Sequence, residues 1–335
     1  MKRTLAAIGA ATLTVLTLAA SPAPAAAREL VMATVSLTSD DFQLATAWSN
    51  ILRRSGLGHT ITPVETGTVR GMRSLAQGKV DITVIGAPHY LDALGRTGSY
   101  KEDPPELSAR YKDMRVLFAM DSGMAQYVVR ADSGIRRFAD LKGKTVAIGR
   151  PGGNAGHVST RLLRVHGLDA EKGDVRLQYL DYGAALDQLG NGQIDATLVW
   201  GGIPQAALDN ASRSHRLRFI SPDAGSLEPF RAAVTNGANY VYRTVPARTL
   251  AEAYGGRIEA DDPVRFWTFP FMIMVRKDMP EDVAYGITKV FWENVEEVRK
   301  ASAALRTLDI ENALEGLSAE LHPGAARYFK EKKVI

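Results

Sequence analysis

The residues that could carry chemistry in this chain do not have the spacings that hydrolases use. Its six histidines show no His-Glu-x-x-His spacing, so a hydrolytic zinc site is not indicated. No Gly-x-Ser-x-Gly segment is present to form the sharp turn that exposes a serine nucleophile. The absence of cysteine excludes thiolate nucleophiles, thiolate metal sites and disulfides. We therefore expect a protein that is not an enzyme, with no catalytic residues, no metal ligands and no cofactor.

One glycine-rich segment is suited to binding instead. It runs from Arg150 to His157 between an expected strand and an expected helix, and its backbone amides would point out of the strand end. A nucleotide-binding loop would continue with Gly-Lys-Ser/Thr, which is absent here. The segment therefore suggests a small anion rather than a nucleotide.

Two stretches of the chain are closely similar in sequence: LAQGKVDITV at 75–84 and LGNGQIDATL at 189–198. Each reads as the end of a helix, a glycine stop and a buried strand. The repeat predicts two α/β lobes built alike, whose strand ends face each other across a cleft. That cleft is where we expect a small molecule to bind.

Hydrophobic periodicity supports this alternation of strands and helices. The expected lobe 1 strands are 30–34, 59–64, 80–85, 114–120 and 271–275, with helices at 41–54, 69–76, 281–299 and 323–332. The expected lobe 2 strands are 126–130, 141–149, 175–180 and 194–199, with helices at 155–165 and 183–189. Beyond Pro222 the pattern loosens into a polar stretch that continues to the strand at 271–275.

The first residues are typical of a secretory signal peptide. Lys2 and Arg3 precede an apolar stretch from Leu5 to Ala20, and Pro and small residues follow up to Ala27. We expect residues 1–27 to be removed and the protein to be periplasmic, without the lipid-bearing cysteine of tethered receptors. No later segment is apolar for long enough to cross a bilayer.

Charge gives little information about partners. The formal net charge of +4 is spread over the chain and forms no basic block or stripe, so no nucleic-acid partner is expected. The remaining length suits a monomer of two lobes: 28–122 plus 268–335 as a discontinuous lobe 1, and 123–267 as lobe 2. A second echo, VVRADSG at 128–134 and MVRKDMP at 274–280, is expected at the two hinge segments between them. The alternative is that both stretches merely leave a strand through the same type of turn.

Longer strings resemble a known family. VRADSGIRRFADLKGKTVAIGRPGG at 129–153, MVRKDMPEDVAYGITKVFWEN at 274–294 and ENALEGLSAELHPGAARYFKE at 311–331 are similar to the TAXI branch of the solute receptors of tripartite ATP-independent periplasmic (TRAP) transporters. The resemblance implies a two-lobed, type II periplasmic binding protein, with each lobe a mostly parallel sheet flanked by helices. It implies delivery of a small organic acid, dicarboxylate or amino-acid-like, to a TRAP permease with fused or paired small and large subunits.

Carried onto this sequence, the resemblance implies four binding loops. In the first, hydroxyls and carboxylates replace the glycines usual in the family; N-capping by Ser39 or Asp40 is the alternative role. In the second, Thr66 or Thr68 could equally cap the helix while Arg70 stays solvated. In the fourth, Tyr90 and Trp200 could instead pack within the lobes. The candidate ligand-binding residues are Ser36, Thr38, Asp40 and Phe42; Thr66, Gly67, Thr68 and Arg70; Arg150, Gly152, Gly153, Asn154, Ala155 and His157; and Gly86, His89, Tyr90, Trp200 and Gly201.

Two other classes of function remain compatible with the sequence. The substrate-binding protein of an ABC importer shares the expected fold and the LKGK segment at 141–144. A ligand-sensing module or an exported enzyme could use the same two-lobed scaffold.

The signal peptide generates the first prediction. Because small residues follow the apolar stretch, the mature N-terminus should be Arg28 or lie within a few residues of it. N-terminal sequencing of the protein from a periplasmic extract measures this directly. Recovery of an intact Met1 from washed membranes would contradict it.

Overall fold

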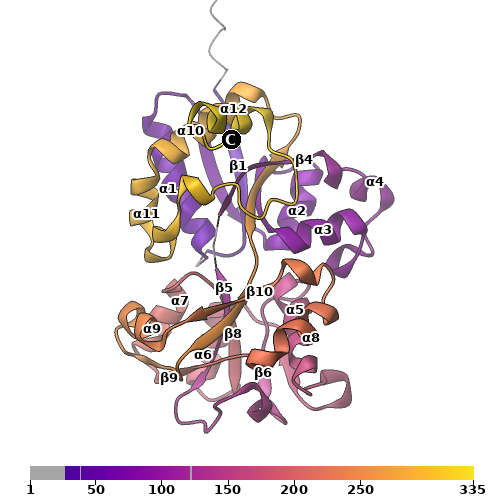
Figure 1. Cartoon of the computed structure of the whole chain (residues 1–335), viewed down its shortest axis with the longest axis vertical. Helices are drawn as coiled ribbons and strands as arrows, with labels where there is room; N and C mark the ends of the chain where they lie inside the picture. Colours follow the sequence, from indigo (N-terminus) through magenta and orange to yellow (C-terminus); the bar gives the residue numbers. More distant parts are fainter. Residues whose placement is uncertain (1–26, 38, 121–122) are drawn as a thin grey trace, which may run out of the picture.

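The computed structural model describes residues 27–37, 39–120 and 123–335. Outside the described residues lie 1–26, which are all but the last residue of the expected signal peptide, the candidate residue Thr38, and residues 121–122 at the expected boundary between the lobes. Two lobes lie one above the other and are joined by two chain segments (Figure 1). Each lobe is a sheet flanked by helices, which confirms the expected fold class.

Lobe 1 combines the first part of the chain with its C-terminal helices, which lie beside the N-terminal strands in Figure 1. Its sheet has five strands in the order β2-β1-β3-β13-β4. Its strands are β1 (Glu29–Thr34), β2 (Thr60–Glu65), β3 (Ile82–Gly86), β4 (Met114–Met120) and β13 (Phe271–Arg276), and its helices are α1 (Asp40–Arg54), α2 (Thr68–Ala76), α3 (Ala87–Gly95), α4 (Pro105–Ser108), α10 (Glu281–Glu293), α11 (Val295–Ala301) and α12 (Pro323–Glu331).

Lobe 2 is one continuous stretch of chain. Its main sheet has the order β11-β9-β5-β8-β6-β7, and β10 and β12 form a separate antiparallel pair. Its strands are β5 (Met124–Arg130), β6 (Thr145–Ala147), β7 (Arg176–Gln178), β8 (Ala196–Gly201), β9 (Leu217–Ile220), β10 (Val241–Val245), β11 (Ile258–Glu259) and β12 (Val264–Thr268), and its helices are α5 (Asn154–Val165), α6 (Tyr182–Gly190), α7 (Ala206–Ser212), α8 (Leu227–Ala233) and α9 (Ala247–Tyr254).

The two lobes are built alike, as the sequence repeat predicts. In lobe 1 three parallel strands, β2, β1 and β3, are followed by the antiparallel strand β13; in lobe 2 the parallel strands β7, β6 and β8 are followed by the antiparallel strand β5. Asp81 and Asp195, the aspartates of the repeat, accept the amides of Val31 and Thr145 at 2.9 and 2.8 Å. Equivalent loops are therefore fixed by the same backbone contact.

The Val-Arg-x-Asp echo has a structural role that differs from the expected one. Arg276 donates to the Val80 carbonyl at 2.8 Å, beside the glycine turn of the first repeat. The Arg130 guanidinium packs so close to Gly192 that a Cβ there would overlap it. Both arginines end their strands at the side away from the lobe boundary. The prediction that the echo marks the hinge is therefore wrong: it secures the turn between helix and strand in each lobe.

Several elements also differ from those that the hydrophobic periodicity predicts. The polar stretch after Pro222 contains β10, β12, α8 and α9, which are too short to show a clear period. The expected helix 281–299 is two helices, interrupted at Asn294. The strand end at 86–90 continues directly into α3, because Pro88 suits the first turn of a helix.

The lobes meet at a cluster of aromatic side chains beside the second crossing segment. Phe269 stacks on Trp200 with ring centroids 4.9 Å apart, and Trp267 lies 4.9 Å from Trp200. Thr268 donates to the Gly123 carbonyl at 2.6 Å, which ties the two crossing segments together. These large rings bury apolar surface at the lobe boundary and so hold the two lobes together there.

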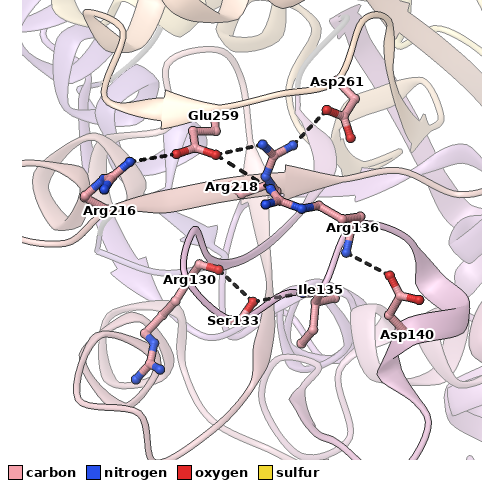
Figure 2. A network of polar contacts seen from close by, with 9 residues as sticks. All are labelled: Arg130, Ser133, Ile135, Arg136, Asp140, Arg216, Arg218, Glu259 and Asp261. Atoms are coloured by element: carbon pink, nitrogen blue, oxygen red, sulfur yellow. Dashed lines mark hydrogen bonds and ion pairs between the residues drawn. The ribbon is translucent and has the colours of Figure 1, made fainter.

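The outer end of lobe 2 carries a network of ion pairs (Figure 2). Glu259 accepts from Arg216 at 3.0 Å and from Arg218 at 2.7 Å, and Arg218 also pairs with Asp261 at 2.9 Å. Arg218 lies on β9, and Glu259 lies on the edge strand β11, where charged side chains discourage pairing with another chain. Among the helices of the described residues, none is both long and apolar enough to cross a bilayer.

Packing at the hinge generates the second prediction. A Cβ added at Gly86 would lie 2.0 Å from Phe269 Cε2, although its φ of −71° suits alanine. Gly86→Ala should therefore lower the free energy of unfolding by about 1–3 kcal/mol, measured by urea unfolding. Gly225→Ala, where a Cβ meets nothing within 4 Å, is the matched control. Equal stability of the two variants would mean that the Phe269 ring moves aside without cost.

Candidate functional site

A pocket of about 70 Å³ lies between the lobes, at the carboxyl ends of strands from both sheets. Lobe 1 contributes the loop after β1 and the start of α2, and lobe 2 contributes the loop after β6 and the starts of α5 and α6. The lining residues are Val35, Ser36, Gly67, Thr68, Arg150, Gly153, Asn154, Ala155, Asp181 and Tyr182. This is the position at which open α/β sheets bind small molecules.

Two helix N-termini, one from each lobe, face this pocket without a side-chain cap. The N-cap residues are Gly67 for α2 and Gly153 for α5, and neither has a side chain that could accept a first-turn amide. By contrast, α6 is capped by Asp181, which accepts the Ala184 amide at 3.0 Å. The uncapped ends offer free N–H groups and the positive ends of two helix dipoles, which together favour an anion.

Asn154 supplies a side-chain donor at the same place. It is 7% exposed, and its Nδ2 has no hydrogen-bond partner. The Tyr100 hydroxyl of lobe 1 lies beside it and is also buried without a well-formed hydrogen bond. Burial raises the pKa of Tyr100, so the hydroxyl stays protonated and can donate. Unsatisfied buried donors are costly. Asn154 lines the pocket, so a ligand oxygen there could accept from its Nδ2, whereas Tyr100 lines neither pocket.

Arg150, the expected anion-binding residue, is already paired across the cleft. Its Nη1 lies 2.5 Å from Glu65 Oε1, at the end of β2 in lobe 1. A larger pocket of about 430 Å³ adjoins the first and opens outward. It shares Arg150 with the inner pocket and adds Arg70 and Arg73, of which Arg73 is paired with Asp103 at 2.7 Å.

Asp40 forms a second contact between the lobes. It is 5% exposed, and its Oδ2 accepts the amide of Gly202, which follows β8. Burial raises the pKa of Asp40 to about 6, although the Gly202 bond partly offsets this and Asp41 adds to it. Burial also raises the pKa of Asp41 to about 6. Asp41 accepts the Val35 amide at 2.8 Å and so shapes the first loop.

A third contact between the lobes is polar and lies beside α3. Asn236 of lobe 2 donates to Asp92 Oδ1 at 2.9 Å. His89 Nδ1 is 3.9 Å from Asp92 Oδ2, and burial lowers the pKa of His89. Burial and Arg161 lower the pKa of His157 on the opposing face, so both imidazoles favour the neutral form.

The structure brings many, but not all, of the expected residues together. Those that line the inner pocket are Ser36, Gly67, Thr68, Arg150, Gly153, Asn154 and Ala155. Those that line only the outer pocket are Thr66, Arg70 and Gly152. Those that line neither pocket are Asp40, Phe42, Gly86, His89, Tyr90, His157, Trp200 and Gly201.

The expected fourth loop is the part that the structure does not bring to the pocket. Tyr90 packs in the lobe 1 core and donates to the Tyr111 carbonyl at 3.2 Å. Trp200 and Gly86 contact the hinge ring Phe269. Both aromatic residues pack within or between the lobes, which was the alternative role for them. Asp40 is not an N-cap either, because it is the first residue of α1 and bonds to Gly202.

The sequence analysis did not identify two residues that line the inner pocket, Asp181 and Tyr182, or two that lie beside its lining residues, Glu65 and Tyr100. Asp181 and Tyr182 begin α6, and the Asp N-cap before an apolar run is a signal that could have located them. Glu65 and Tyr100 reach the site only through the fold, so no local pattern indicates them. Within the described residues, no group of three or more His, Asp or Glu side chains is arranged to hold a metal ion.

Two similar α/β lobes, linked by two crossing segments and enclosing a pocket between their strand ends, define a type II periplasmic solute-binding protein. The chain belongs to the NMT1-like family, whose sequence profile matches residues 32–332. That match covers nearly all of the described part of the chain.

Solved structures of the same general kind are similar at low identity. The alkanesulfonate-binding protein SsuA from Xanthomonas axonopodis pv. citri, bound to MOPS, is 17% identical over 83% of this chain and 74% of its own, with a TM-score of 0.45. A TRAP periplasmic solute-binding protein from Shewanella oneidensis with bound succinate is 12% identical over 92% and 93%, with a TM-score of 0.47. One from Ralstonia eutropha H16 with bound (S)-2-acetolactate is 15% identical over 91% and 92%, with a TM-score of 0.44.

The buried carboxylate at the lobe boundary generates the third prediction. Folded Asp40 takes up a proton near pH 6, whereas an unfolded aspartate does so near about pH 4. Between these values the folded state holds more protons, so the contribution of Asp40 to the free energy of unfolding increases as pH falls. In Asp40→Asn this contribution is absent. The stability of wild type minus that of the variant should therefore rise by roughly 1–3 kcal/mol from about pH 7.5 to about pH 4.5.

Urea unfolding at several pH values measures this difference. The variant is the necessary reference, because buried histidines with lowered pKa make the opposite contribution over part of the same range. Asp132→Asn, at a carboxylate that is 77% exposed, is the control and should keep a constant offset from wild type. Parallel profiles for wild type and Asp40→Asn would contradict the prediction.

Proposed function

We propose that this protein is an extracytoplasmic receptor that captures a small organic acid, a dicarboxylate or amino-acid-like solute, between its lobes. The observation that carries the proposal is the meeting of two uncapped helix N-termini, α2 from lobe 1 and α5 from lobe 2, at one pocket. Each end alone would attract an anion weakly. An anion between them contacts both lobes and therefore stabilises their closed arrangement.

Side chains around the pocket support an acid with more than one oxygen-bearing group. Arg150 offers a charged donor for a carboxylate, and Asn154 Nδ2 is a free buried donor a few residues along the same loop. Asp181 is the one carboxylate among the residues that line the inner pocket, and it already caps α6. The balance of groups favours a ligand that mainly accepts hydrogen bonds.

We infer further that the receptor delivers its solute to a TRAP permease and belongs to the TAXI branch. The strings at 129–153, 274–294 and 311–331 support this, since they extend over both lobes and resemble that branch. Action as a monomer in the periplasm is part of the same proposal. The alternative is the binding protein of an ABC importer, which uses the same fold; a neighbouring permease gene without an ATPase gene would favour the TRAP assignment.

The fourth prediction tests anion binding by titration calorimetry with succinate, 2-oxoglutarate and L-glutamate as probes. At 100 times its dissociation constant, a bound probe should stabilise the folded state by about 2.7 kcal/mol, which raises the melting temperature measurably. Arg150→Ala should weaken binding of the best probe by roughly 1.5–3 kcal/mol, because a charge-assisted hydrogen bond is lost.

Arg248→Ala provides the control, since this arginine is 88% exposed on α9, away from the pocket. The affinity of Arg248→Ala for the best probe should equal that of wild type. Equal affinity of Arg150→Ala and wild type would remove Arg150 from the site. A preference for neutral or cationic solutes in a thermal-shift screen would overturn the anion proposal as a whole.

A further inference from the structure

The ion pair between Glu65 and Arg150 bridges the two lobes at the edge of the pocket. Glu65 is the last residue of β2, and Arg150 lies in the loop between β6 and α5. Their Oε1 and Nη1 atoms are 2.5 Å apart, and the side chains are 24% and 42% exposed. The pair is therefore partly exposed to solvent, and another anion could replace Glu65 on Arg150 without opening the core.

Glu65 holds a second group with its other oxygen. Its Oε2 accepts the amide of Leu37 at 2.8 Å, in the loop between β1 and α1. The Leu37 side chain is 62% exposed, whereas Ser36 and Ser39 of the same loop are buried and hydrogen-bonded to each other. A single carboxylate thus connects an arginine of lobe 2 to the first loop of lobe 1.

Because Glu65 already pairs with the Arg150 guanidinium, a ligand carboxylate would have to compete with Glu65 for it. Glu65 neutralises the guanidinium, and Asp181 adds a negative charge to the pocket lining. A ligand carboxylate that approached while Glu65 stayed in contact would be repelled by it at close range. It would bind well only if Glu65 moved away from Arg150.

We propose that Glu65 is an internal competitor: it occupies on Arg150 the position of the ligand's carboxylate, and the ligand displaces it. This inference rests on the proposed binding of an organic acid. It deepens that proposal by assigning Glu65 a role in setting affinity. In this proposal the whole Glu65 carboxylate swings away, so the Leu37 amide also loses its acceptor, while the bonds from Val35 to Asp41 and between Ser36 and Ser39 keep the rest of the first loop in place. Glu65 thereby couples occupancy of the pocket to the exposed surface around Leu37.

The experiment compares wild type, Glu65→Gln and Glu259→Gln by calorimetry with succinate, 2-oxoglutarate and L-glutamate. Glutamine keeps the size of Glu65 and can still accept the Leu37 amide, but it cannot hold Arg150 as an ion. Glu65→Gln should bind the best probe at least about fivefold more tightly. Glu259→Gln removes a carboxylate held by arginines at the outer end of lobe 2 (Figure 2), so its affinity should stay within about twofold of wild type.

A second measurement uses wild type alone and does not depend on the variant folding. Amide hydrogen exchange at Leu37 should become faster when the best of the three probes is saturating, because the acceptor of that amide has been displaced. Exchange at Val31, whose amide is held by Asp81 within lobe 1, should not speed up.

The possible outcomes separate the two proposals. If wild type binds a probe, but Glu65→Gln binds it no more tightly or the Leu37 amide stays protected, Glu65 is a latch between the lobes and the competitor role is overturned. If wild type binds none of the three acids, the proposed function itself fails. Tighter binding by Glu65→Gln together with faster exchange at Leu37 supports the competitor.

Discussion

The packing of Phe269 between the lobes is the contact on which the arrangement of the whole molecule depends. Its ring lies against Gly86 of lobe 1 and stacks on Trp200 of lobe 2, directly beside the second crossing segment. Because this ring is buried and contacts both lobes, it holds them together at their common edge. The pocket loops come from four separate parts of the chain. This contact holds them in register together with the contacts between Asp40 and Gly202, Glu65 and Arg150, and Asp92 and Asn236.

Local sequence patterns were sufficient to predict most of the helix, glycine turn and strand that occur once in each lobe. The helix, glycine and strand of each repeat follow from chemistry within a few residues, and the aspartates Asp81 and Asp195 have matching backbone contacts. The stretch after Pro222 was not predictable in this way, because β10 and β12 are stabilised by each other and by the sheet beneath. The role of the Val-Arg-x-Asp echo was also missed, since Arg130 and Arg276 contact turns that are distant in sequence.

The candidate site was likewise predictable only where the signal is local in the sequence. Glycines that precede a helix, such as Gly67 and Gly153, are visible in the sequence as positions that leave amides free. The pairing of Arg150 with Glu65 is not visible, because an acidic residue at a strand end is usually only solvated. The aromatic residues were misleading for a related reason. Trp200 lies near the end of β8 and Tyr90 in the helix after β3, yet both rings pack beside the pocket rather than in it.

The position of β13 in the lobe 1 sheet has a consequence for how the chain folds. This strand lies between β3 and β4, so β4 has no neighbour in the sheet until residues 271–276 are present. Lobe 2 is continuous in sequence and can complete its sheet before that point. A chain that emerges N-terminus first would therefore finish its second lobe before its first, with the edge of β3 exposed in the meantime. Contacts between segments so distant in sequence form slowly, and the unpaired edge during that interval is a natural surface for a chaperone.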